Sequence, residues 1–442
     1  MFSVGVASLP IGESLRRIVA DHTNPPLFYL LLKGWMAVGG DGDQWVRLLP
    51  CLFAMLLGAA LVWLARESRV GGWTATLAVA LAAASPLSVD LANEVRAYSL
   101  LALLACLSIA ATLCDRRLRT RDSFALLTII NVALVHAHYF GWLTVGAECA
   151  LVCASWPRDV ARRVGRSVVY TMLAFLPWAL MVAVHALSNP APLRNVAWIA
   201  PPEFAAPLWL MRDFTGRSGN AVADLVWLSV VGIALAALAA AEWNRRRART
   251  GADAASSVDA SVVLLLAVAG LGVPLAIWSV SLVGGHSIWV QRYLVGAAGP
   301  VALLAAIAIT SLLPQRAAAA AVGGLLWTAV AFAALPGRAP TKFDWRRFAR
   351  RIDLAVGSPS DIYALEAYTA APLQRYARAG MRVHVVTALD QLPAGDAWLV
   401  YRRESFAAGS PAEPLHALGF STVTALSAET AGQRIVAVRI RR

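Results

Sequence analysis

Ionisable and aromatic side chains recur in the short polar segments between the long apolar stretches of this chain. They form four groups: Asp21 to Asn24 before a Pro-Pro pair, Glu94 to Tyr98, His136 to Tyr139, and Arg292 with Tyr293. Charged groups at membrane depth are costly, and those that occur there commonly mark functional sites. Because these groups all fall at the same end of the apolar stretches, they predict a site at that end.

The carboxylates and arginines suggest acid–base chemistry beside an anion. Asp21 is a candidate general base or cation ligand, because the diproline that follows fixes the direction of the chain. Its alternative is an ordinary turn that starts a helix. Arg96 suits a phosphate or diphosphate, since a guanidinium can make two parallel hydrogen bonds. The alternative there is a closed Glu94–Arg96 ion pair at a helix end.

The histidines and the later Arg-Tyr pair are less specific. His136 and His138 are two residues apart, so on a helix they point to different faces and cannot share one metal ion. His138 could therefore act alone, as a ligand or as a hydrogen-bond donor. The alternative is that this segment is only a polar turn at the membrane interface. Arg292 and Tyr293 suit either phosphate recognition or anchoring at the membrane surface.

The composition is that of a polytopic α-helical membrane protein. Of 442 residues, 59% are hydrophobic and 15% are charged, and the mean hydropathy is +0.61, whereas soluble proteins carry about 25% charged residues. A span needs about 20 apolar residues. About ten transmembrane helices are predicted, at residues 46–65, 71–90, 97–114, 123–138, 139–156, 167–186, 224–243, 259–284, 293–313 and 317–336.

Arginine placement predicts the orientation. One alternating set of loops holds 15 arginines, from Arg66 to Arg316, and the opposite set holds 5. The arginine-rich loops are therefore predicted to be cytoplasmic. Most of the net charge of +13 reflects this bias, so a nucleic-acid partner is not indicated. The four polar groups then face outward, as do residues 1–45 and 338–442.

Three regions are predicted. Residues 1–45 form an extracytoplasmic juxtamembrane segment with helices near 11–19 and 27–38, and residues 46–337 form the transmembrane helical domain. Residues 338–442 form a small extracytoplasmic α/β domain. Its strands are expected at 361–367, 383–387, 398–401 and 435–440, with helices near 342–355, 371–379 and 411–418. No phosphate-binding loop, dinucleotide motif or zinc-type Cys/His spacing occurs.

Taken in order, the motifs resemble a known family. They comprise Asn24-Pro25-Pro26-Leu27-Phe28-Tyr29, Val46-Arg47-Leu48-Leu49-Pro50, Ser85-Pro86 with Asn93-Glu94-Val95-Arg96-Ala97-Tyr98-Ser99, His138-Tyr139-Phe140-Gly141, Arg292-Tyr293-Leu294 and Asp344-Trp345-Arg346. As a set they are similar to the GT-C glycosyltransferases that use polyprenyl-phosphate sugars. The bacterial members related to protein O-mannosyltransferases and to lipid A aminoarabinose transferases have the most similar pattern.

The resemblance implies a GT-C-like fold and an enzyme in a bacterial-type inner membrane. It would move a sugar from a polyprenyl-phosphate donor to an extracytoplasmic lipid, glycan or protein, with inversion. Arg96 and Arg292 would bind the phosphate, and Tyr98, Tyr139 and Tyr293 would help to bind the substrate. Glu94 would serve catalysis by positioning, or hold a divalent cation together with His138. Asp21 and Asn24 would line the acceptor or sugar side. No other cofactor is implied.

The front of the chain departs from the family. Its members begin with a span followed by an Asp-Glu pair whose Asp is the general base, and Phe2-Ser3-Val4-Gly5 resembles the residues just after that pair. We therefore expect the natural start to lie upstream. A protein made from Met1 should then insert without transferring sugar, unless Asp21 replaces the missing base.

Two other classes of protein compete with a transferase. A transporter or flippase for a lipid-linked glycan should carry polar residues at mid-span or paired broken helices, whereas the polar groups here lie at the outer ends. A catalytically inactive membrane scaffold would tolerate the loss of Glu94 and Arg96 with no change in any product.

Overall fold

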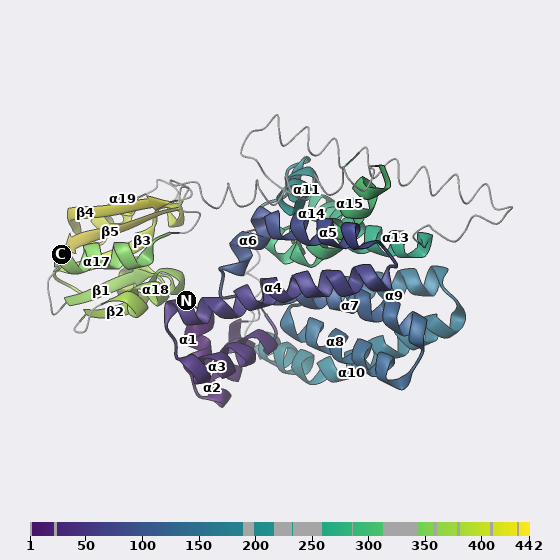
Figure 1. Cartoon of the computed structure of the whole chain (residues 1–442). Coiled ribbons are helices and arrows are strands. Elements are labelled where there is room, and N and C mark those ends of the chain that lie inside the picture. Colours follow the sequence, from purple (N-terminus) through teal and green to yellow (C-terminus); the bar gives the residue numbers. More distant parts are fainter. Residues whose placement is uncertain are drawn as a thin grey trace, which may run out of the picture. The chain divides into compact units, whose positions relative to one another are not determined.

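The computed structural model divides the chain into two compact units. One consists of Met1–Gly5 with Leu335–Arg442, and the other of Val6–Ala334. The structure describes residues 2–21, 24–188, 199–215, 232, 259–284, 286–312, 343–356, 360–377, 381–406, 410–430 and 433–442. Figure 1 labels their helices and strands.

Three short helices precede the first spanning helix: α1 (Phe2–Ser8), α2 (Ile11–Asp21) and α3 (Leu27–Gly39). The predicted helices near 11–19 and 27–38 are confirmed by α2 and α3. Paired indole contacts join α3 to the next helix, because Trp35 and Trp45 each donate a hydrogen bond to the other's carbonyl oxygen (2.8 and 2.9 Å) and their rings stack at 4.5 Å. A Cβ at Gly39 would lie 2.1 Å from the Trp45 ring, so this contact requires glycine.

Within the described residues, five helical stretches are long and apolar enough to cross a membrane. They are α4 (Asp43–Glu67), α7 (Tyr98–Leu118), α10 (Arg158–Ser188), the run Ala260–Val283 and the run Gln291–Ser311. The fourth contains α13 (Ala260–Ala267), the π-helical η2 (Val268–Gly272) and α14 (Val273–Val283), and the fifth contains the 3-10 helix η3 (Gln291–Ala297) and most of α15 (Ala298–Leu312).

The predicted span 71–90 is not one straight helix. It consists of α5 (Gly72–Ala84) and α6 (Pro86–Ala92), which are bent by 64° and count as a sixth span if they are taken together. Pro86 has no N–H with which to continue α5. Ser85 then caps α6 by accepting a hydrogen bond from the Ser88 amide (3.2 Å), and its hydroxyl donates to the Asp213 carbonyl of α11 (Ala206–Thr215) at 2.8 Å.

The predicted spans 123–138 and 139–156 are the helices α8 (Arg121–Ala137) and α9 (Gly141–Ser155), of 17 and 15 residues. The chain turns between them at the predicted place. A Cβ at Gly141 would lie 2.6 Å from the Leu134 carbonyl oxygen, so glycine is needed for this close turn. The predicted spans 224–243 and 317–336 lie outside the described residues, and the predicted count of about ten is not confirmed.

α7 is the central helix of the bundle. It is buried along almost its whole length and packs against α4, α8 and η3, whereas most of α10 is exposed. α4, α7, α8 and α10 run alongside one another in Figure 1. Ion pairs join the arginine-rich loops at one end of the bundle: Arg117 with Glu67 (2.8 Å), Arg116 with Asp259 (2.8 Å), Arg119 with Asp159 (2.6 Å) and Arg163 with Asp115 (2.5 Å). These loops therefore share one end, as their arginine content predicts.

A buried polar cluster crosses the middle of the same bundle. The Glu148 carboxylate of α9 lies 2.9 Å from the Ser108 hydroxyl and 2.7 Å from the Thr112 hydroxyl, both on α7. The Ser108 hydroxyl is also 2.7 Å from Oδ1 of Asn131 on α8, and the Asn131 amide nitrogen is 3.4 Å from the hydroxyl of Ser167 on α10. All five side chains are buried. The cluster thus connects four helices through hydrogen bonds.

The C-terminal unit contains a five-stranded mixed sheet of order β2-β1-β3-β5-β4. Its strands are β1 (Ser360–Leu365), β2 (Met381–Val386), β3 (Ala397–Arg402), β4 (Ser421–Thr430) and β5 (Gln433–Arg441). β1 is parallel to β2 and β3, while β5 is antiparallel to β3 and β4. The helical elements are α17 (Trp345–Val356), α18 (Ala367–Tyr376), η4 (Leu389–Gln391), η5 (Arg403–Ser405) and α19 (Ala412–Ala417).

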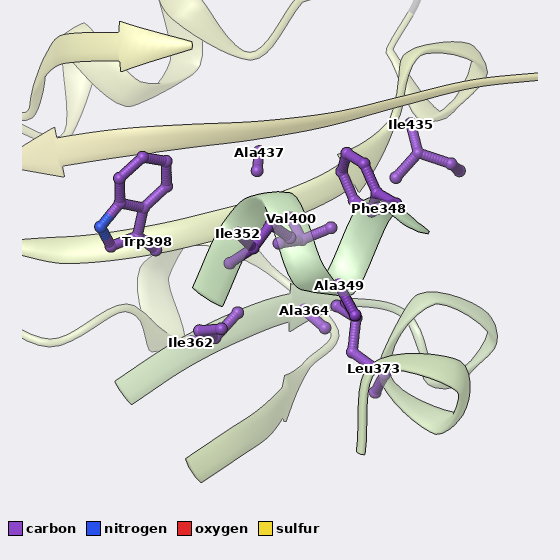
Figure 2. Close-up of a cluster of buried hydrophobic side chains, with 11 residues drawn as sticks. Phe348, Ala349, Ile352, Ile362, Ala364, Leu373, Trp398, Val400, Ile435 and Ala437 are labelled. Carbon is purple, nitrogen blue, oxygen red and sulfur yellow. The ribbon is translucent and has the colours of Figure 1, made fainter. Parts of the chain in front are cut away.

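Figure 2 shows one of the two cores of this unit. Phe348, Ala349 and Ile352 of α17 lie against Trp398 and Val400 of β3, together with residues of β1, β5 and α18. A second core on Leu399, Val436 and Val438 packs against Leu415 of α19. The four predicted strands and the three predicted helices of this region are confirmed as elements. The strand β4 is a finding that the sequence did not predict.

Acid should weaken the β3–β5 pair. Hydrogen bonds from Arg441 and Arg439 lower the pKa of Asp396 from its usual 3.8 to about 2. Because the pKa is lower in the folded state, this carboxylate stabilises the fold fully above about pH 4, and its contribution is lost as the pH falls toward about 2. We expect Asp396→Asn to lower the stability of this unit at pH 7 and to reduce its loss of stability between about pH 4 and pH 2. Near-UV circular dichroism during urea unfolding measures both effects, and an unchanged acid limb in the variant would contradict them.

Candidate functional site

Three elements that are far apart in the sequence bring aromatic and basic side chains together. Tyr98 is the first residue of α7, His138 lies in the turn between α8 and α9, and Tyr293 lies in η3. The His138 ring centroid is 5.1 Å from that of Tyr293 and 6.0 Å from that of Tyr98, and the two tyrosine rings are 6.0 Å apart. We call Tyr98, His138, Arg292 and Tyr293 the aromatic–arginine cluster.

Arg292 supplies the positive charge of this cluster. Its guanidinium carbon lies 5.9 Å from the Tyr98 ring centroid and 5.7 Å from that of Tyr293, within the range of cation–π contacts. Tyr98, Tyr293 and Glu94 act electrostatically on Arg292. A half-buried arginine next to one carboxylate and two phenols suits an anionic ligand.

Local backbone geometry places these side chains. The Arg96 amide donates to the Glu94 carbonyl (2.7 Å) in the tight turn before α7, and the Ser99 hydroxyl bonds back to the Leu91 carbonyl (3.2 Å). The turn holds Glu94 and Arg96 near Tyr98, and both act electrostatically on that residue. The Tyr293 amide donates to the Val290 carbonyl at the start of η3 (2.8 Å).

His138 is extended at the end of α8, with φ −158° and ψ 140°. Its side chain is 2% exposed. The Phe140 amide donates a hydrogen bond to its Nδ1 (3.1 Å), and the Phe140 ring lies 5.3 Å from that of Tyr293. Phe140 thus both fixes the histidine ring and closes the cluster on one side.

Tyr139 belongs to a second group. Its hydroxyl accepts a hydrogen bond from Nε1 of Trp178 on α10 (3.2 Å), and its ring lies 6.3 Å from that of Phe175. Asp21, the last residue of α2, acts electrostatically on Tyr139. Asn24 is buried in the connection from α2 to α3.

The predicted site residues are therefore gathered in part. Tyr98, His138, Arg292 and Tyr293 lie together, with Glu94 and Arg96 beside Tyr98, whereas Asp21 and Tyr139 form a separate pair of neighbours on the α10 side. The sequence did not indicate Trp178 and Phe175 as site residues, because both are apolar residues in a predicted span. Pro177, which interrupts the helical hydrogen bonding next to Trp178, is the signal that could have singled out this position.

The cluster does not fit a divalent cation. Among the residues that the structure describes, no three His, Cys, Asp or Glu side chains gather in a way that could hold a metal ion. A histidine that binds a metal usually donates its other ring N–H to an acceptor. At His138 the ring nitrogen Nδ1 instead accepts from an amide. In this arrangement Nδ1 of His138 is not available to bind a cation together with Glu94.

Comparison with known proteins identifies the fold. The chain is similar to two crystal structures of ArnT from Cupriavidus metallidurans, one bound to undecaprenyl phosphate and one in the apo state. For the bound structure the TM-score is 0.57 at 14% identity, with 96% of this chain and 92% of that chain covered. For the apo structure the TM-score is 0.58 at 14% identity, with 98% and 93% covered.

The fold is similar to that of ArnT. ArnT is a lipid A aminoarabinose transferase with a GT-C fold, so the predicted GT-C-like architecture is confirmed, including a polytopic helical membrane part and a small sheet domain. No family model matches the sequence. No curated protein matches it either.

Proposed function

We propose that this chain is a membrane glycosyltransferase that uses a sugar linked to a polyprenyl phosphate. The observation that carries the proposal is the aromatic–arginine cluster, which occurs in a chain whose fold is similar to that of an ArnT solved with undecaprenyl phosphate. A phosphate-linked lipid matches the partly buried positive charge that Arg292 places over the Tyr98 and Tyr293 rings.

Arg292 is proposed to bind the phosphate of the donor. When the bond between the anomeric carbon and the phosphate oxygen breaks, negative charge develops on that oxygen. A guanidinium already held in place stabilises this charge without further reorganisation. Arg96 acts electrostatically on the same tyrosine as Arg292 and is proposed as the second phosphate-binding arginine. Tyr98 and Tyr293 support this role by holding Arg292.

The acceptor is proposed to attack the anomeric carbon from the face opposite the phosphate, which inverts the configuration. The acceptor hydroxyl must lose its proton to a carboxylate during this step. Glu94 is the carboxylate that acts electrostatically on Arg292, so we propose that it positions the acceptor. Asp21, beside Tyr139, is the proposed base of this chain, and Asn24 and Tyr139 line the sugar or acceptor side.

We propose that ten helices cross a bacterial-type inner membrane, with the 245–257 loop in the cytoplasm and the C-terminal unit outside. The asymmetric arginine distribution supports this orientation. A cysteine at exposed Ser410 should react with a membrane-impermeant maleimide in intact spheroplasts, whereas one at Ser256 should react only after lysis. The unmodified chain, with its five native cysteines, gives the background. Reaction of Ser256→Cys before lysis would contradict the topology.

The function is tested with the purified chain in nanodiscs. We expect it to bind undecaprenyl phosphate but not undecaprenol. With Asp21 acting as the base in place of the family's Asp-Glu pair, it should also form a new glycosidic bond when a lipid-linked sugar and an envelope extract are supplied. Movement of the lipid-linked sugar between leaflets with no new bond would identify a transporter. Absence of both binding and transfer would identify a scaffold. Either result would reject the proposed transferase.

A further inference from the structure

The hydrogen bonding of His138 determines which of its ring nitrogens carries the proton. A backbone N–H can only donate, so the Phe140 amide, at 3.1 Å, requires a lone pair on Nδ1 of His138. In the uncharged ring the proton must then be on Nε2. His136, two residues earlier, is the opposite case. Its Nδ1 lies 2.8 Å from the Val132 carbonyl oxygen, which can only accept, so there Nδ1 carries the proton.

The Nε2–H of His138 is a buried donor. Nε2 has no hydrogen-bond partner in the part of the chain that the structure describes. Buried donors are nearly always satisfied in folded proteins, so one that is left open in a site calls for an explanation. The Tyr98 and Tyr293 rings that flank His138 are the same two rings over which the Arg292 guanidinium lies. The Nε2–H donor of His138 and the guanidinium of Arg292 therefore lie next to the same two rings, those of Tyr98 and Tyr293.

We propose that His138, as the uncharged Nε2–H tautomer, donates a hydrogen bond to a phosphate oxygen of the polyprenyl-phosphate donor beside Arg292. This assignment rests on the proposed function and adds a residue role to it. The histidine supplies a fixed dipole and no charge, so it binds the phosphate without placing a second positive charge next to Arg292. It also replaces the role in cation binding that the resemblance suggested, because Nε2 carries a proton in this tautomer.

Nitrogen-15 NMR of histidine-labelled protein in nanodiscs tests the assignment. Spectra of His136→Asn and His138→Asn identify the two residues among the seven histidines. We expect His138 to show a protonated Nε2 and His136 a protonated Nδ1. Undecaprenyl phosphate should move the Nε2–H signal of His138 downfield and leave that of His136 in place, and undecaprenol should move neither. Zn²⁺ without lipid should move neither.

Binding measurements on variants provide the second part of the test. His138→Phe removes the donor while keeping a ring, and it should weaken undecaprenyl phosphate binding about 10- to 100-fold, as expected when a hydrogen bond to a charged group is lost. His138→Gln keeps an N–H donor and should restore most of the affinity. His136→Phe is the matched control, since its ring contacts Phe175 outside the cluster, and it should change the affinity less than about 3-fold.

The outcomes separate the two proposals. Binding of undecaprenyl phosphate without a shift at His138, an Nδ1–H tautomer at His138, or a shift caused by Zn²⁺ would overturn the role of His138 alone. Failure of the unmodified protein to bind undecaprenyl phosphate would overturn the proposed function and this inference with it. If His138→Phe fails to fold, the unmodified protein still decides the question through its NMR signals.

Discussion

Replacing Arg292 with alanine is expected to lower the rate of sugar transfer roughly 100- to 1,000-fold, as expected when one preorganised group that stabilises developing negative charge is removed. Arg292 lies over both the Tyr98 and the Tyr293 ring, so its truncation removes the positive charge that faces these rings. Transfer from a lipid-linked donor, measured as turnover at saturating donor, gives the rate. Affinity for undecaprenyl phosphate gives the contribution of binding.

Two further variants make this result specific. Arg292→Lys keeps the charge but loses the planar, forked donor, and it should recover only a small part of the rate. Arg212 of α11 is a matched control, because it is also a partly buried arginine over an aromatic ring, that of Trp209, and pairs with Asp213. Arg212→Ala should retain transfer within a few-fold. Full activity of Arg292→Ala would show that the phosphate is bound elsewhere.

The second large effect is expected at Glu148. The Ser108 hydroxyl has one hydrogen, yet it lies within hydrogen-bond distance of both Oδ1 of Asn131 and Oε1 of Glu148. If Glu148 were ionised, one of these contacts would join two acceptors. If Glu148 is protonated, it donates to Ser108, Ser108 donates to Asn131, and Thr112 donates to the other carboxyl oxygen. With the Asn131 amide in this orientation, the hydrogen-bond geometry favours the neutral acid.

A neutral Glu148 predicts different results for two substitutions. Glu148→Gln can donate to Ser108 and accept from Thr112, so it should stay within about 1 kcal/mol of the unmodified protein. Glu148→Ala leaves a cavity and open polar groups in the centre of the bundle, and it should lose roughly 3 kcal/mol or more. Thermal unfolding in nanodiscs measures both, with Cys153→Ala on an exposed face of α9 as the control. If the glutamine variant is destabilised as much as the alanine variant, Glu148 is an anion.

Local patterns predicted the elements but not all of their contacts. Periodicity and turn residues predicted the helices α2 and α3, the turn at His138 and the four apolar strands of the C-terminal unit. These signals depend only on residues that are close together in the sequence. β4 was missed because Ser421–Thr430 is a mostly exposed run with little apolar alternation, and its pairing with β5 is what makes it a strand. The bend at Ser85 was missed because hydropathy continues smoothly through Pro86.

The candidate site shows the same limit. Arg292, Tyr98 and His138 were recognisable as polar groups at the ends of apolar stretches, but their meeting depends on how η3 packs against α7. Asp21 was grouped with Arg96 and Arg292 from its polar setting, whereas the structure gives it Tyr139 as a neighbour. The hydrogen-bond partners of Glu148 could not be predicted at all. They depend on three helices whose hydroxyl and amide groups meet only after folding.

The position of Glu148 also limits the order in which this protein can assemble. α9 has 15 residues, which at about 1.5 Å per residue is roughly 22 Å, less than the hydrocarbon thickness of about 30 Å. A short helix with a central carboxyl partitions poorly into lipid by itself. Its partners Ser108 and Thr112 lie on α7, which leaves the ribosome first. We therefore expect α9 to insert stably at the translocon only while α7 is close by, so that the helices from α7 to α9 enter the bilayer as one group.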